Sequence, residues 1–63
     1  MHVIKLGDRV RILYPKYAAG QTGTVLEQET LEDGSKTGHW LVKVDGERYM
    51  ILALLPKDMK VLR

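Results

Sequence analysis

The side chains best suited to chemistry in this sequence are cationic and aromatic, and most of them lie near its start. Arg9 and Arg11 alternate with apolar residues, and Lys43 does so further along the chain. Two tyrosines and a lysine follow within the segment 14–17. Basic side chains interleaved with aromatic rings can bind carboxylates or phosphates and can stack on flat groups. The residues predicted to contact a partner are Arg9, Arg11, Tyr14, Lys16, Tyr17 and Lys43.

These residue types also have purely structural interpretations. Arginine and lysine face water on the strands of any soluble protein, and loop tyrosines can cover one end of a small fold. Trp40 alternates with Val42 and Val44, which favours a place in the core over a binding role.

Catalytic and metal-binding patterns are missing from the sequence. A nucleophile requires a neighbouring base, and a metal requires several ligands at suitable spacing. The chain has no cysteine, and its two histidines, His2 and His39, stand apart from such patterns. The pair Gly20 and Gly23 leads into a strand, whereas phosphate-binding glycine loops lead into a helix. We therefore expect no enzymatic activity, no cofactor and no metal site.

A short strand must position the two arginines. Segment 9–13 alternates them with Val10 and Ile12, the period of a strand with one buried face. Pro15 ends this strand because proline lacks the amide donor of a sheet ladder. We expect a loop over 14–20.

The next predicted strand spans 23–30 and leads into a polar segment. Val25 should face the core, and Gly23 allows either a positive φ or a close approach of two backbones. The segment 27–38 is acidic and contains the turn sequence Asp33-Gly34-Ser35. We expect 27–38 to protrude as an acidic β-arm or loop.

Three further elements complete the predicted fold. The strand 39–45 alternates cleanly, and Asp45-Gly46 predicts a tight type I′ turn that pairs it with a strand over 47–52. Residues 55–59 suit a single 3₁₀ turn, and 60–62 a last strand. No segment shows a long helical period, so we expect no α-helix.

The bulk properties predict a small basic protein with one domain over 1–63. Ten basic and eight acidic residues give a net charge of +2, which is too balanced to require a nucleic-acid partner. No apolar run approaches the ~20 residues of a membrane-spanning helix, and the first residues do not form a signal peptide. The absence of cysteine fits a reducing compartment. We expect a cytoplasmic protein without membrane insertion.

Five short strands, a long first loop and a 3₁₀ turn before the last strand describe an SH3-like barrel. The KOW motif of ribosomal proteins and transcription elongation factors resembles the first half of this chain. The similar residues are Gly7-Asp8-x-Val10-x-Ile12 and Gly20-x-x-Gly23-x-Val25. This resemblance implies RNA binding in translation or transcription.

The E-type peripheral subunits of photosystem I, with related small accessory subunits of photosynthetic complexes, resemble most of the chain. The similar residues are Val10-Arg11-Ile12-Leu13-x-Pro15, Tyr17, Gly23-Thr24-Val25 and the strand near 40–44. The chain departs from that family in its longer acidic arm and in the Asp45-Gly46 turn, which replaces a longer loop. The resemblance implies an accessory role in a photosynthetic electron-transfer complex.

We therefore expect an all-β protein, a single five-stranded SH3-like barrel that serves as a non-catalytic docking or accessory module of a larger protein assembly. Its basic residues should attract an acidic protein surface. The alternative is a KOW-type module that uses the same residues on RNA.

Overall fold

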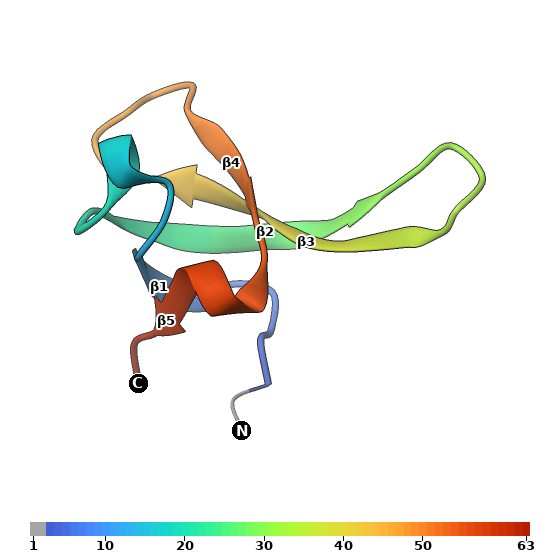
Figure 1. The fold of residues 1–63 in the computed structure, drawn as a ribbon, viewed down its shortest axis with the longest axis horizontal. Helices are drawn as coiled ribbons and strands as arrows, with labels where there is room; N and C mark the ends of the chain where they lie inside the picture. Colours follow the sequence, from blue (N-terminus) through green and yellow to red (C-terminus); the bar gives the residue numbers. More distant parts are fainter. Residues whose placement is uncertain (1–2) are drawn as a thin grey trace.

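The computed structural model describes residues 3–63, which form one antiparallel sheet with the strand order β4-β3-β2-β1-β5 (Figure 1). The strands are β1 (Arg9–Ile12), β2 (Thr22–Thr30), β3 (Lys36–Val44), β4 (Ile51–Leu54) and β5 (Met59–Val61). Two 3₁₀ turns are η1 (Lys16–Ala18) and η2 (Pro56–Asp58). Residues 3–63 contain no α-helix. The prediction of five strands with a 3₁₀ turn before the last is confirmed.

The sheet is not closed. β4 and β5 lie at opposite ends of the strand order, so each is an edge strand. The SH3-like barrel therefore stays a prediction, while the all-β class is confirmed.

The core lies on one face of this curved sheet. Val10 and Ile12 are buried while the arginines on either side of Val10 are exposed, as the alternation of β1 predicts. Trp40 is half-buried and packs against the core, which agrees with its predicted structural role. The buried hydrophobic residues are Val10, Ile12, Ala18, Val25, Val42, Val44, Leu54 and Met59.

Gly23 provides a close approach between β2 and β3. A Cβ atom at this position would lie 2.6 Å from the carbonyl oxygen of Lys43 and 2.8 Å from Cγ1 of Val42. No side chain fits into that space without moving the backbone of β3. Of the two reasons predicted for this glycine, close approach is the one that applies.

The connection between β3 and β4 differs from the prediction. A turn at Asp45-Gly46 does form, since the amide of Glu47 donates to the carbonyl of Val44 at 3.4 Å, but only Gly46 has a positive φ, so the turn is not of type I′. The predicted strand over 47–52 begins too early, because the chain stays outside the sheet over 45–50 and β4 starts at Ile51. Within this segment, the amide of Met50 donates to the carbonyl of Glu47 at 3.2 Å. The amide of Val44 donates to the carbonyl of Met50 at 3.0 Å, which closes the loop. The antiparallel pairing of the two strands is confirmed.

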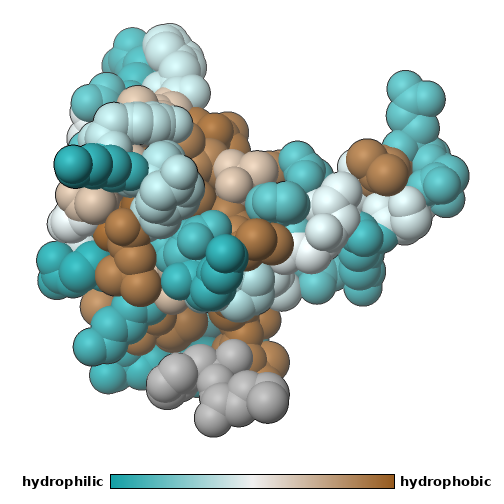
Figure 2. All heavy atoms as spheres, in the orientation of Figure 1, coloured by the Kyte–Doolittle hydropathy of each residue, from teal (hydrophilic) through white to brown (hydrophobic). Residues whose placement is uncertain are grey.

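The segment 27–38 is a β-arm. β2 and β3 continue beyond the core as a hairpin whose tip holds residues 31–35 (Figure 1). β3 consequently begins three residues earlier than predicted. Two register shifts interrupt the β2–β3 ladder, between Val25 and Glu27 and between Gln28 and Thr30. Figure 2 shows the arm as a mainly hydrophilic extension with one hydrophobic spot near its end.

The segment 14–20 is more ordered than the predicted loop. It contains η1, and Ala18 is buried in the core. The amide of Gly20 donates to the carbonyl of Ile12 at 2.8 Å, and the amide of Ile12 donates to the carbonyl of Gln21 at 2.8 Å. These contacts fix both ends of the segment against the sheet.

Candidate functional site: a basic sheet face

The outer face of the sheet carries four cationic side chains. Side chains of directly paired residues in an antiparallel sheet lie on the same face. Arg9 pairs with Thr24, which pairs with Lys43, and Arg11 pairs with Lys60. We call Arg9, Arg11, Lys43 and Lys60 the basic face; all four are exposed.

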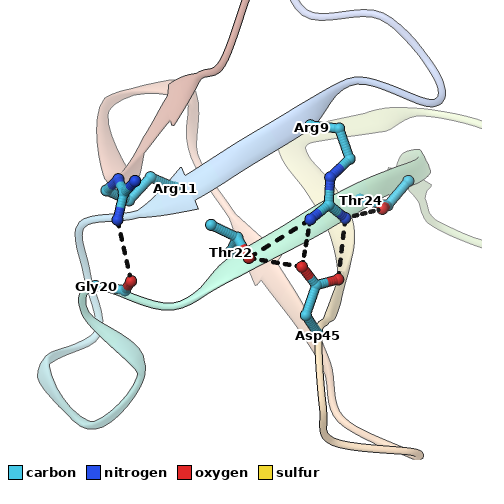
Figure 3. A network of polar contacts seen from close by, with 6 residues as sticks. All are labelled: Arg9, Arg11, Gly20, Thr22, Thr24 and Asp45. Carbon is cyan, nitrogen blue, oxygen red and sulfur yellow. Dashed lines mark hydrogen bonds and ion pairs between the residues drawn. The ribbon is translucent and has the colours of Figure 1, made fainter.

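Arg9 is the most constrained of the four (Figure 3). Its guanidinium spans β2 and binds both carboxylate oxygens of Asp45, one of them at 2.9 Å. It also donates to the hydroxyl of Thr24 at 2.7 Å, while the hydroxyl of Thr22 donates to Asp45 at 2.6 Å. A bidentate arginine–carboxylate pair is strong for an exposed contact because its geometry is fixed.

This network changes the acid–base properties of its members. The hydrogen bonds from Arg9 and Thr22 hold the pKa of Asp45 well below its usual range. The same contact raises the pKa of Arg9. Asp45 is thus ionised at neutral pH and belongs to a contact within the chain.

Arg11 lies two residues along the same strand and lacks a carboxylate partner. Its guanidinium donates to the carbonyl of Gly20 at 3.4 Å, a long and weak contact (Figure 3). Among residues 3–63, no carboxylate forms an ion pair with Arg11, Lys43 or Lys60. These three charges face solvent.

The predicted aromatic residues lie on the segment that follows β1. Tyr14 is 63% exposed and Tyr17 is 67% exposed, and Lys16 is exposed beside them. Tyr17 and Lys16 belong to η1, which the buried Ala18 anchors. Both tyrosine rings are therefore exposed on the segment 14–20, whose last residue, Gly20, contacts Arg11.

The structure thus groups the predicted residues only in part. It aligns Arg9 and Lys43 through Thr24, whereas Trp40 belongs to the opposite, core-facing side. Lys60 was not among the predicted contact residues, although its position in the predicted last strand made it an outward candidate. The ion pair of Asp45 with Arg9 was not predicted either, since Asp45 was expected only as a turn residue.

His39 lies outside the basic face, in β3 at the base of the β-arm. Its Nδ1 is 3.2 Å from the hydroxyl of Thr37 and 3.7 Å from a carboxylate oxygen of Glu29. No group of three side chains in the described part of the chain could hold a metal ion. The other histidine, His2, lies outside the described residues.

Comparisons of the chain with protein-family models, curated proteins and solved structures find no match. Over residues 3–63 there is no helix with the length and apolar character needed to cross a membrane.

Proposed function

We propose that this chain is a non-catalytic docking module of a larger protein assembly and that its basic face binds an acidic protein surface. The observation that carries the proposal is the set of three exposed cations, Arg11, Lys43 and Lys60, without ion-pair partners among residues 3–63. They stand on paired strands, so little order is lost when a partner binds. Complementary charge on a partner would accelerate and orient its approach.

The resemblance to the E-type peripheral subunits of photosystem I supplies the host that we propose, a photosynthetic electron-transfer complex, with this chain on its cytoplasmic side. The connection between β3 and β4 spans 45–50, which is closer to the longer loop of that family than a two-residue hairpin would be. The long acidic arm stays as a departure.

RNA is the second candidate partner because Tyr14 and Tyr17 are exposed on the segment that follows β1. Such rings can stack on unpaired bases. The small net charge of +2 favours protein over RNA, because proteins dedicated to nucleic acid usually carry a clear basic excess.

An NMR titration tests the proposal. Isotope-labelled protein is mixed either with a peptide of glutamates or with single-stranded RNA of mixed sequence, at low and at physiological salt. We expect the peptide to shift the amides of Arg11, Lys43 and Lys60, and we expect Lys43→Gln to weaken that binding more than Lys36→Gln on the arm. Tighter, steeply salt-dependent binding of the RNA would favour the second candidate. Absence of any response to the peptide at low salt would refute the docking proposal.

A further inference from the structure

Arg11 and Lys60 form an unusual pair on the basic face. They are direct cross-strand partners between β1 and β5, so two positive charges lie side by side on one face. Like charges in this position destabilise a sheet. Arg9, the other arginine of β1, forms an ion pair with Asp45, whereas no carboxylate of residues 3–63 forms an ion pair with Arg11 or Lys60. The free protein therefore has an unmet preference for an anion at this pair.

An apolar groove adjoins the same pair. It has a volume of about 460 Å³ and is lined by Ile4, Leu13, Pro56, Met59, Lys60 and Val61. Lys60 belongs to both features, since it lines the groove and pairs with Arg11. Met59 and Val61 pair with the core residues Ile12 and Val10, so the groove lies along the edge strand β5, beside the cationic pair and toward the core face of the sheet. Leu13 follows Arg11 by two residues and is 50% exposed.

We propose that Arg11, Lys60 and this groove form one composite site for a segment of a protein partner in which a carboxylate neighbours an apolar side chain. The inference rests on the docking function proposed above and specifies the partner's chemistry. The carboxylate binds the Arg11 guanidinium as Asp45 binds that of Arg9, and it neutralises the repulsion from Lys60. The apolar side chain enters the groove and leaves water.

The composite site also separates a protein partner from RNA. Phosphate can replace a carboxylate on Arg11, but the phosphate backbone carries no apolar side chain for the groove. Charge complementarity alone would involve Lys43 as much as Lys60, whereas the composite site excludes Lys43, which lies two strands away from β1.

The experiment compares three synthetic peptides that alternate glutamate with leucine, glutamate with serine, and glutamine with leucine. Binding to the full chain is measured by NMR at physiological salt, with the methyl signals of Leu13, Met59 and Val61 as reporters of the groove. We expect the glutamate–leucine peptide to shift these methyl signals and to bind about tenfold more tightly than either control. Arg11→Gln and Lys60→Gln should each weaken it about three- to fivefold, and Lys43→Gln less than about twofold.

A variant of the groove completes the test. Leu13→Ser exposes no core surface, since Leu13 already faces solvent, and it should reduce glutamate–leucine binding to the level of glutamate–serine. Equal binding of the peptides with leucine and with serine, or an equal effect of Lys43→Gln and Lys60→Gln, would overturn the composite site and leave the docking function standing. If no glutamate peptide binds at low or physiological salt, both proposals fail. Preference for single-stranded RNA, added as a fourth ligand, would likewise overturn the composite site.

Discussion

Arg9 and Arg11 occupy equivalent outward positions on β1, yet their guanidinium groups meet different surroundings. Arg9 is held by Asp45 and two threonines, whereas Arg11 has one long contact to a carbonyl. The strand register does not explain this difference, because Arg9 pairs with Thr24 and so with Lys43, whereas Asp45 donates its amide to Thr22, the partner of Arg11. The guanidinium of Arg9 reaches the carboxylate of Asp45 diagonally across β2. We infer that Arg9 stabilises the fold and that Arg11 is available for binding.

The role of Asp45 can be tested through the pH dependence of stability. Its pKa is lower in the folded protein than in the unfolded chain, so its contribution is present above about pH 4 and is lost as the pH falls below that value. Asp45→Asn should lower the free energy of unfolding at neutral pH. The difference from the wild type should shrink on acidification to about pH 3, measured by urea unfolding.

A matched control for Asp45 lies in the same loop. Glu47 forms no ion pair within residues 3–63, and Glu47→Gln should leave the neutral-pH stability close to that of the wild type.

The wild type itself will lose stability in acid through other groups. Hydrogen bonds from Lys5 and Arg63 lower the pKa of Asp8, and those from Ser35 lower the pKa of Asp33. A constant gap between wild type and Asp45→Asn over the whole range would contradict the assignment.

The two faces of the sheet predict opposite responses to truncation. Val42 is fully buried, so Val42→Ala should cost about 2 kcal/mol through lost transfer energy and the cavity that it leaves. Arg11 is exposed, so Arg11→Ala should change stability by less than about 0.5 kcal/mol. Chemical unfolding of both variants measures the contrast. A large loss in Arg11→Ala would mean that its side chain supports the fold and is not free for a partner.

Among the elements, the contact between β2 and β3 depends on one glycine. Gly23→Ala would place a methyl group against the carbonyl oxygen of Lys43, and the strands must separate to admit it. We expect a loss of about 1–3 kcal/mol and faster hydrogen exchange in the paired residues of β2 and β3.

Gly34 provides the comparison for Gly23. It has a φ of +87° at the tip of the arm, where a Cβ would meet no atom within 4 Å. Gly34→Ala strains the turn by its backbone conformation, so its effect on hydrogen exchange should stay within the arm. If Gly23→Ala also changed exchange only locally, close packing of β2 against β3 would not be the reason for this glycine.

The β-arm should be dispensable for the stability of the fold. Its tip, residues 31–35, is exposed, and the buried residues of β2 and β3 lie at the other end of the hairpin. Replacing residues 31–35 by Asn-Gly should preserve the pairing of Thr30 with Lys36 and change the unfolding free energy by less than about 1 kcal/mol. Thermal and urea unfolding of the shortened chain check this. Loss of cooperative unfolding would show that the tip supports the core.

Sequence patterns predicted the strands well where local geometry decides. The period-2 alternation of β1 and β3 follows from the pleat itself, so Val10, Ile12 and Val42 could be assigned to the core directly. The Asp45-Gly46 sequence predicted a turn that forms, but not the length of the connection, since β4 begins only at Ile51. The bond between Arg9 and Asp45 joins residues 36 apart in the chain and has no local signal either. The pairing of Arg11 with Lys60 likewise depends on the register between the first and last strands, for which the sequence holds no local signal.

For the molecule as a whole, the net charge of +2 conceals a separation of charge. The basic face lies over the core sheet, and the four carboxylates of segment 27–38 extend away along the arm. An approaching acidic partner is attracted at one end and repelled at the other, so the field of the protein should orient the encounter. This effect acts on the association rate more than on the lifetime of the complex.

Stopped-flow measurements with a fluorescent glutamate–leucine peptide can separate the two rates. Raising the salt from low to physiological concentration should slow association several-fold, because the screening length shrinks to about 8 Å, while the dissociation rate should change little. Lys43→Gln should slow association by less than about twofold without affecting dissociation, since Lys43 contributes to the field but not to the composite site. Lys36→Gln, on the arm, should have a smaller effect. If only the dissociation rate depended on the salt concentration, the charges would act as direct contacts in the complex. The basic face would then bind its partner without steering its approach.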